Sequence, residues 1–284
     1  MHLENPSFSY NFAEKYRMNP ESLTEKIILT AKEAGFYLSE QRKSFRPEDI
    51  IEKGKYDYVS HIDKDTEILL IKRLSELLPE AGFISEEGQA TYHDEEYCWI
   101  IDPLDGTTNY IHDFAPYCVS IALRKGTTIL IGVVYEVCRR ECFYAWKDGG
   151  AYLDGKPIHT SPTTETDKSF IGIGLPYNYE KYRALADRLI PHFYGASAGI
   201  RLTGSAATNL CYVAAGRFDF WLEAYLKLWD FAAGARIVME AGGTVSGFDN
   251  HPDFTLSHHI VASSNNILHK QVLNFISEYT NHIT

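Results

Sequence analysis

The sequence of 284 residues has no hydrophobic run long enough to cross a membrane. A membrane-spanning helix needs about 18 to 20 apolar residues in succession, and one of the longest apolar runs here is only Thr128–Val134. The first ten residues also show no basic segment followed by an apolar one, which a secretory signal would require. We therefore expect no membrane partner and no export.

Cysteine and positive charge are both scarce. The five cysteines are odd in number and form no C-x-x-C pair, which favours free thiols and a cytoplasmic protein. Lysine and arginine total 27 against 38 aspartate and glutamate residues, a net charge of −11. Such a surplus repels nucleic acid and anionic lipid but suits a protein that binds cations. We expect no nucleic-acid partner.

The remaining composition is that of a folded protein, with 45% apolar and 23% charged residues and no repeat. Strand-like and helix-like segments mix along the whole chain, which indicates an α/β or α+β class with layered sheets. We expect an arm over 1–18 and two halves, 19–150 and 151–284, that meet at the Gly149-Gly150 turn. The predicted helices are 19–38, 60–78, 179–189, 206–214, 231–240 and 267–279, and the main predicted strands are 83–84, 97–101, 118–123, 129–135, 141–146, 170–175 and 259–263.

Two short motifs imitate known active sites. Residues 150–156 fit the start of a nucleotide-binding P-loop, but Pro157 stands where a hydroxyl should hold magnesium, and Asp154-Gly155 is typical of a hairpin turn. Residues 195–199 fit the G-x-S-x-G pattern of serine hydrolases, but no strand leads into them and no helix leaves them. Both segments are predicted to be turns.

The strongest local signal is acidic. An apolar strand ends at Asp102, Pro103 turns the chain and excludes an inner strand, and Asp105 follows. Two carboxylates across a rigid turn offer the hard oxygen ligands that Mg²⁺ prefers. Gly106 permits a close backbone approach, and Thr107 can begin a helical turn whose free N–H groups receive an anion. An ordinary acidic turn remains the alternative interpretation.

Three other carboxylates have both an ordinary and a catalytic interpretation. Glu86 follows a short strand and can be a solvated turn residue. Asp63 lies three residues after Ser60, the spacing of a capping box. Asp230 precedes an apolar helix, where an N-cap belongs. A carboxylate that caps a helix can still face a metal ion.

Together, these segments resemble the inositol monophosphatase family, the lithium-sensitive, Mg²⁺-dependent phosphomonoesterases. The resemblance covers about residues 20–275, and its blocks occur in family order. They are 60–67 (SHIDKDTE), 84–88 (ISEEG), 99–112 (WIIDPLDGTTNYIH), 204–217 (GSAATNLCYVAAGR) and 228–243 (LWDFAAGARIVMEAGG). Tyr225 and Leu228 differ from the glycine and proline of the family pattern, and Ser85 replaces a frequent glycine.

The resemblance implies alternating α, β, α, β and α layers, a homodimer, and hydrolysis of a small polyol phosphate with two to three Mg²⁺ ions per site. Inositol 1-phosphate is the favoured substrate. The alternatives are the same chemistry on histidinol phosphate, a 3′,5′-bisphosphate nucleotide, fructose 1,6-bisphosphate or NADP, and a non-catalytic accessory protein such as some bacterial relatives of this family.

The resemblance also assigns roles to residues. One metal ion would bind Glu86, Asp102 and the Leu104 carbonyl, a second Asp102, Asp105 and Asp230, and a weaker third would lie beside Glu86. The amides of Gly106 and Thr107 would bind phosphate. Thr107 and Glu86, with Asp63 behind them, would position and deprotonate the attacking water. Asp105, Ala206 and Glu223 would contact the substrate.

Overall fold

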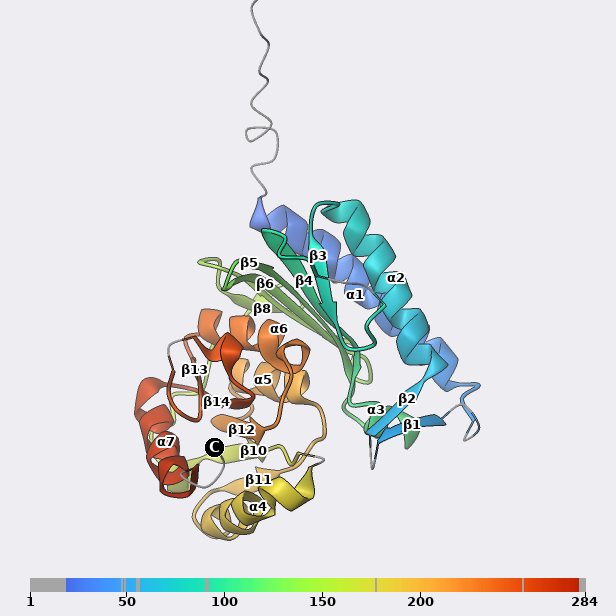
Figure 1. Ribbon diagram of the computed structural model, residues 1–284. Coiled ribbons are helices and arrows are strands. Elements are labelled where there is room, and N and C mark those ends of the chain that lie inside the picture. Colours follow the sequence, from blue (N-terminus) through green and yellow to red (C-terminus); the bar gives the residue numbers. More distant parts are fainter. Residues whose placement is uncertain are drawn as a thin grey trace, which may run out of the picture.

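The computed structural model describes residues 19–280, apart from residues 47, 49, 55, 56, 90, 91, 177 and 252. The predicted arm, residues 1–18, lies outside the described residues. Two large sheets and three helical layers, with a small two-stranded sheet beside them, make up the described part of the chain (Figure 1). The predicted succession of α, β, α, β and α layers is confirmed, and it determines where the site can form.

The first sheet has seven strands in the order β3-β4-β5-β6-β7-β8-β9, with only β3 and β4 parallel. A separate two-stranded sheet of β1 and β2 precedes it in the chain. The strands are β1 (Ile50–Gly54), β2 (Asp57–Ser60), β3 (Gly82–Ser85), β4 (Tyr97–Asp105), β5 (Cys118–Lys125), β6 (Thr128–Glu136), β7 (Glu141–Trp146), β8 (Ala151–Leu153) and β9 (Lys156–Pro157).

Helices α1 (Pro20–Arg42) and α2 (His61–Leu77) cover the outer face of this sheet. The Asn19 side chain caps α1 by accepting from the Glu21 N–H at 3.0 Å, and Pro20 occupies the first turn, as the sequence predicts. Side chains of β4 alternate between the two faces of the sheet. Trp99 packs against the outer helices, whereas Ile100 packs against the inner helical layer.

The second sheet has five strands in the order β11-β10-β12-β14-β13. Its strands are β10 (Phe170–Ile173), β11 (Gly199–Arg201), β12 (Phe220–Ala224), β13 (Thr244–Gly247) and β14 (His259–Ser263). Helices α4 (Tyr179–Phe193) and α7 (Asn266–Thr280) pack on its outer face. Short 3₁₀ turns, η3 (Thr166–Lys168) and η4 (Phe254–Leu256), lie in the connections.

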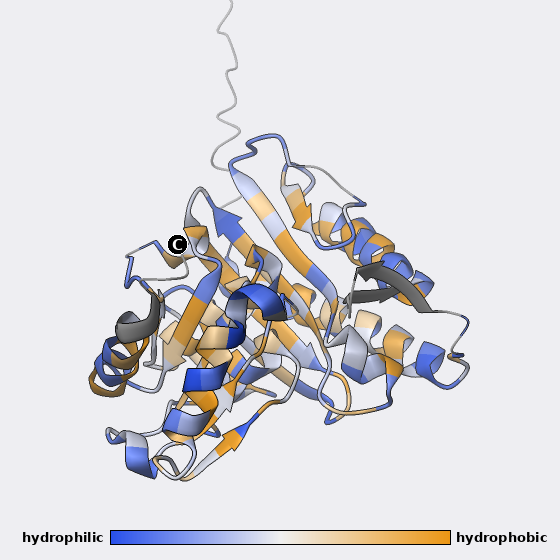
Figure 2. Cartoon of the chain, turned by 60° about the horizontal axis from the view of Figure 1, so that its bottom comes forward, coloured by the Kyte–Doolittle hydropathy of each residue, from blue (hydrophilic) through white to orange (hydrophobic). Residues whose placement is uncertain are grey.

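Helices α5 (Ala206–Ala214) and α6 (Leu228–Glu240) lie between the two sheets and share one apolar core with both. The packing is close enough that glycine is required. A Cβ at Gly132 of β6 would overlap with the Ala233 carbonyl of α6, and one at Gly234 would lie 2.5 Å from the Leu210 Cβ of α5. The strands are mostly hydrophobic, whereas the outer helices mix hydrophobic and hydrophilic residues (Figure 2).

The structure corrects several predicted boundaries. Strand β4 does not stop at Pro103 but continues to Asp105, with an irregular register between Asp102 and Asp105 opposite β5. Helix α4 runs past the predicted end to Phe193 and contains Pro191 in its last turn, where the proline cannot give the backbone hydrogen bond to the carbonyl four residues earlier. The short strands β12 and β13 were not predicted.

Other expectations are met or remain open. Asp154-Gly155 forms the two-residue turn between β8 and β9, with both residues at positive φ. The five cysteines are free. No helix in the described ranges is both long and apolar enough to span a bilayer. The division at residue 150 stays a prediction, and the last strand of the first sheet ends at Pro157.

Candidate active site

One cavity of about 630 Å³ opens between the two sheets, where β4, α3 (Thr107–Ile111) and the segments before α5 and α6 meet. The described residues that line it include nine that the sequence singles out. These are Glu86, Asp102, Leu104, Asp105, Gly106, Thr107, Ala206, Glu223 and Asp230. Five of them are carboxylates: Asp102 and Asp105 lie on β4, and Glu86, Glu223 and Asp230 come from three other stretches of the chain. The structure therefore brings the predicted acidic residues into one place.

Asp102 is the most deeply buried of these carboxylates, with 2% of its surface exposed. Its Oδ1 accepts a hydrogen bond from the Leu104 N–H at 3.0 Å across the Pro103 turn. Burial raises the pKa of Asp102 well above its usual value, and the negative charges of Glu86, Asp105 and Asp230 raise it further. Buried carboxylates that repel one another are stabilised by a cation between them.

A second carboxylate, Glu67 of α2, holds the segment that carries Glu86. The Glu67 side chain is fully buried. It accepts from the Ser85 hydroxyl at 2.8 Å, the Glu87 N–H at 2.8 Å and the Gln89 N–H at 2.7 Å. These bonds fix the turn after β3 and keep Glu86 at the cavity. Sequence reasoning gave Glu67 no role, because its partners lie about twenty residues away.

Asp105, the last residue of β4, faces the N-terminus of α5. Its Oδ2 accepts from the Ser205 hydroxyl at 2.6 Å and the Ala207 N–H at 2.8 Å, and its Oδ1 accepts from the Ala206 N–H at 3.3 Å. Burial raises the pKa of Asp105, and these hydrogen bonds oppose the rise. In the described ranges, no three His, Cys, Asp or Glu side chains are already arranged as a metal cage.

The sequence predicts Asp230 as the N-cap of α6, but in the structure Asp230 is the third residue after the cap. Lys227 is the cap, and its N–H donates to Asp230 Oδ2 at 2.7 Å. The helix begins earlier than predicted because Leu228 and Trp229 already belong to its first turn. Burial raises the pKa of Asp230 well above its usual value. The other carboxylate oxygen, Oδ1, has no role in this cap.

Asp63 stands behind the cavity and reaches it through Thr107. The Thr107 hydroxyl lies 3.3 Å from Asp63 Oδ1 and 3.1 Å from the Leu104 carbonyl oxygen, and it can donate to either. Asp63 Oδ2 accepts from the Ser60 N–H at 2.8 Å, which confirms the predicted capping box of α2. The ordinary and the catalytic interpretation of Asp63 are thus compatible in space.

The turn that begins α3 depends on a glycine. Gly106 has φ +95°, and a Cβ there would lie 3.1 Å from the Pro116 carbonyl and 3.2 Å from that of Gly204. Asn109 ties the same turn to the second half of the chain, because its Nδ2 donates to the carbonyls of Pro116 and Thr203 at 2.7 Å each. The backbone amides at the start of α3 therefore occupy fixed positions at the cavity.

Glu223, at the end of β12, lies against the backbone of Gly174 so closely that a Cβ on this glycine would overlap with its carboxylate. Burial, and then the charge of Asp105, raise the pKa of Glu223 to about 8. Near neutral pH, Glu223 is mainly protonated in the metal-free protein and can both donate and accept hydrogen bonds. Both abilities suit a neutral hydroxyl group.

Sequence reasoning missed the apolar part of the cavity lining, which is contributed by Phe114, Ile173, Leu175, Leu202, Tyr225 and Trp229. Tyr225, which departs from the family pattern, is expected in a loop on the substrate side, and the structure places it in the cavity lining. Ser205 was missed as the partner of Asp105, although its position before α5 is a capping signal. The hundred residues between these partners leave no local pattern.

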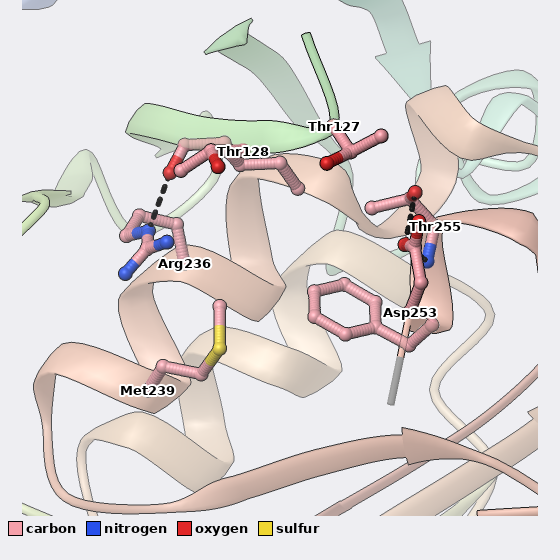
Figure 3. A pocket seen from close by; sticks show the side chains of 8 residues that line it. Thr127, Thr128, Arg236, Met239, Asp253 and Thr255 are labelled. Carbon is pink, nitrogen blue, oxygen red and sulfur yellow. Dashed lines mark hydrogen bonds between the residues drawn. The ribbon is translucent and has the colours of Figure 1, made fainter. Parts of the chain in front are cut away.

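A second cavity, of about 350 Å³, lies between α6, the start of β6 and η4 (Figure 3). Its charged groups already have partners. Arg236 donates from Nε to the Ile129 carbonyl at 2.8 Å and from Nη1 to Glu240 at 3.0 Å. Asp253 accepts from Thr255 and caps η4. No carboxylate cluster lines this cavity, so the site between the sheets is the candidate active site.

Comparison with known proteins shows which family the chain resembles over its length. The model of the inositol monophosphatase family matches residues 19–281. Nus factor SuhB of Escherichia coli strain K12 is 36% identical over 256 residues, which cover 88% of this chain and 94% of that protein. Inositol-1-monophosphatase of Mesorhizobium japonicum is 32% identical over 262 residues, covering 92% and 98%. The solved structure of extragenic suppressor protein suhB from Bartonella henselae has a TM-score of 0.83 at 30% identity, and covers 91% of this chain and 99% of that one.

Proposed function

Because this chain belongs to the inositol monophosphatase family, we propose that it is a magnesium-dependent phosphatase that hydrolyses a small polyol phosphate, with inositol 1-phosphate as the first candidate. Family membership supports phosphatase activity and a general dependence on metal ions. The observation that carries the proposal is the gathering of Glu86, Asp102, Asp105 and Asp230 at one cavity beside the α3 turn.

The donor set suits magnesium, which favours carboxylate and carbonyl oxygens over nitrogen or sulfur. We assign one ion to Glu86, Asp102 and the Leu104 carbonyl, a second to Asp102, Asp105 and Asp230, and a weaker third to Glu86. The hydrogen bonds that Asp105 accepts occupy both lone-pair sites of Oδ2 and leave one on Oδ1 for a metal ion. When bound, such ions neutralise phosphate charge and lower the pKa of a bound water.

The protein groups around this position have separate tasks. The amides of Gly106 and Thr107 bind phosphate oxygens at the start of α3. Thr107 and Glu86 orient the attacking water and accept its proton, and Asp63 holds the Thr107 hydroxyl, 3.3 Å away. An aligned water and neutralised oxygen charge are what hydrolysis of a phosphate monoester requires.

The alcohol part of the substrate would lie toward Asp105, Ala206 and Glu223. The buried Glu223 can exchange hydrogen bonds with neutral hydroxyl groups, whereas a second phosphate beside it would meet negative charge from Asp105. This arrangement supports a polyol monophosphate over a bisphosphate such as fructose 1,6-bisphosphate or a 3′,5′-bisphosphate nucleotide. The name of the Mesorhizobium relative agrees with this choice.

The test is phosphate release from a panel of monophosphates and bisphosphates, with and without Mg²⁺. We expect release from inositol 1-phosphate only with Mg²⁺, and a loss of about a thousandfold in Asp102→Asn because several kcal/mol of charge stabilisation disappear. Asp253→Asn, which changes an acidic residue of the other cavity (Figure 3), serves as the control with wild-type rates. Undiminished turnover in Asp102→Asn would refute the mechanism, and a preference for bisphosphates would refute the substrate.

Two further properties belong to this proposal. We expect Li⁺ to inhibit hydrolysis by displacing the loosely held Mg²⁺, which a titration of the rate with LiCl at fixed Mg²⁺ would measure. We also expect a homodimer, whose mass light scattering would report. If hydrolysis is not inhibited at any Li⁺ concentration, the expectation of lithium inhibition is wrong. A monomeric mass would refute the homodimer.

The similarity to Nus factor SuhB favours a second candidate, an accessory role in transcription that needs no hydrolysis. The two candidates separate in Asp102→Asn, since a binding role would survive the loss of a metal ligand. Retention of the chain on immobilised RNA polymerase, unchanged in this variant, would support the accessory role. The net charge of −11 argues against direct contact with RNA.

A further inference from the structure

Tyr225 has an unusual backbone conformation for its residue type. Its φ is +67°, in the left-handed region where a side chain with a Cβ is strained. Seven described residues other than glycine have positive φ, and five of them are aspartate or asparagine, which tolerate it. The sixth, Arg140, lies in the exposed turn between β6 and β7. Tyr225 is the aromatic member, and it lines the active-site cavity.

The surroundings hold Tyr225 in this conformation through its backbone. Its N–H donates to His259 Nδ1 at 3.1 Å, and the next residue, Leu226, donates to the His258 carbonyl at 2.8 Å. On one side, the ring contacts the buried ring of Tyr182 at 5.8 Å between centroids. Nevertheless, 46% of Tyr225 is exposed. A strained residue that is held in place and still exposes nearly half of its surface at a cavity indicates a use for its exposed side.

The cavity mouth around Tyr225 is apolar. Among the described residues, ten large hydrophobic side chains are exposed, and four of them line this one cavity: Phe114, Leu175, Leu202 and Tyr225. They come from four different loops. Scattered exposed hydrophobic residues need no explanation, but a cluster at the rim of a pocket marks a binding surface. The cavity holds the volume of about twenty water molecules, several times that of a phosphate group.

We propose that this apolar mouth, with Tyr225 as one wall, binds an aromatic or similarly flat apolar group on the alcohol part of the substrate. The inference rests on the proposed phosphatase function and extends its substrate class to monophosphates whose alcohol part also carries a flat apolar group. The phosphate would lie at the α3 turn, and the flat group would lie between Tyr225 and the leucines. The Lys227 Nζ lies over the Tyr225 ring, 5.7 Å from its centroid, and because the Lys227 side chain is exposed it can move aside for a bound group.

The test compares kcat/KM for 2-phenylethyl phosphate with that for glycerol 2-phosphate, both with Mg²⁺. We expect the wild type to favour the aromatic ester. Tyr225→Gly should lower the ratio of the two values about tenfold, mainly through KM, because stacking of aromatic rings strengthens binding by roughly that factor. Tyr225→Phe keeps the ring and should keep the ratio within about twofold.

The matched control is Arg140→Gly, which replaces another residue at positive φ far from this cavity and should leave the ratio unchanged. Tyr225→Gly relieves strain while it loses the ring contacts with Tyr182 and Lys227, so its melting temperature should stay within a few degrees of the wild type. An equal loss of kcat/KM for both substrates in Tyr225→Gly would overturn the inference and indicate that the tyrosine has a purely structural role. A change of oligomeric state in Tyr225→Gly would overturn it in favour of a surface between two copies.

Failure of the phosphatase function itself would look different. It would appear as no Mg²⁺-dependent phosphate release from either ester or from inositol 1-phosphate, and it would overturn the inference as well. Mg²⁺-dependent release from all three, with no preference for the aromatic ester, would overturn the inference alone.

Discussion

Asp63 serves two neighbours with its two carboxylate oxygens. Oδ2 accepts from the backbone and the hydroxyl of Ser60, at 2.8 and 2.7 Å, and Oδ1 accepts from Thr107. One oxygen therefore stabilises the start of α2, and the other faces the residue proposed to orient the water. The spacing of Ser60 and Asp63 predicts the first role. The second depends on a residue 44 positions away, so no local pattern shows it.

Substitutions at the two ends of this contact should separate stability from catalysis. Asp63→Asn keeps an acceptor oxygen but loses the charge, and we expect kcat to fall about a hundredfold with little change in stability. Ser60→Ala removes the cap hydroxyl, and we expect a loss of about 1 kcal/mol in unfolding free energy with kcat preserved. Steady-state kinetics and urea unfolding measure the two effects. Equal rates in Asp63→Asn and the wild type would exclude its part in catalysis.

At the scale of helices and strands, prediction worked where the hydrophobic period was clear. Helix α5 and strands β7 and β14 have the predicted bounds. Strand β12 was missed because its apolar run, residues 220–222, is too short to show alternation, and such a run fits a buried helix equally well. At Pro103 the error was the opposite, because the sequence predicts the end of a strand where β4 continues. A break in the register lets the chain accommodate the proline without leaving the sheet.

The contact between β6 and α6 should tolerate no added methyl group. In Gly132→Ala, the new Cβ meets the Ala233 carbonyl, a backbone atom that cannot rotate away. We expect a loss of about 2 kcal/mol in unfolding free energy, measured by urea denaturation. The binding of Mg²⁺, measured by calorimetry, should weaken as well because α6 carries Asp230. An unchanged denaturation midpoint would show that helix and strand can move apart freely.

The contact of α7 with the second sheet should make stability depend on pH. His269 is 2% exposed, with Nε2 2.8 Å from the Ser246 hydroxyl, and burial lowers its pKa to about 4. The unfolded chain, with a pKa of about 6.5, binds the proton more readily. The stabilisation is therefore complete above pH 6.5 and is lost as the pH falls toward 4.

The loss amounts to about 3 kcal/mol between these limits. Because other groups titrate in the same range, the measurement compares the wild type with His269→Leu by urea unfolding at pH 7, 6, 5 and 4. We expect the unfolding free energy of the wild type to decrease more steeply with falling pH than that of His269→Leu, so that the wild-type value minus the variant value decreases. A difference that stays constant would show that His269 is protonated equally in both states.

At the scale of the whole molecule, the candidate site belongs to neither half of the chain. Glu86, Asp102 and Asp105 come from the first sheet and its loops, and Asp230 comes from α6. The layers and the acidic residues could be anticipated from the resemblance of their motifs. The mutual orientation of these residues could not, because the contact of Asp105 with Ser205 and the apolar mouth around Tyr225 arise only when distant segments pack together.

Binding of Mg²⁺ should therefore stabilise the whole fold. A ligand at a hundred times its Kd adds about 2.7 kcal/mol to the stability of the native state. For a chain of this size, that corresponds to a rise of roughly 5 to 10 °C in Tm. We expect this rise in calorimetry when Mg²⁺ is added after EDTA treatment, and little or none in Asp102→Asn. A full rise in this variant would locate the stabilising ion elsewhere.

The position of α6 between the sheets has a consequence for synthesis on the ribosome. The inner face of the first sheet is complete by residue 157, but its cover, α6, ends only at Glu240. While about eighty further residues are translated, the hydrophobic inner face of the first sheet remains uncovered by α6. A nascent chain in that interval is a natural client for chaperones, and a message cut short there would yield an insoluble fragment.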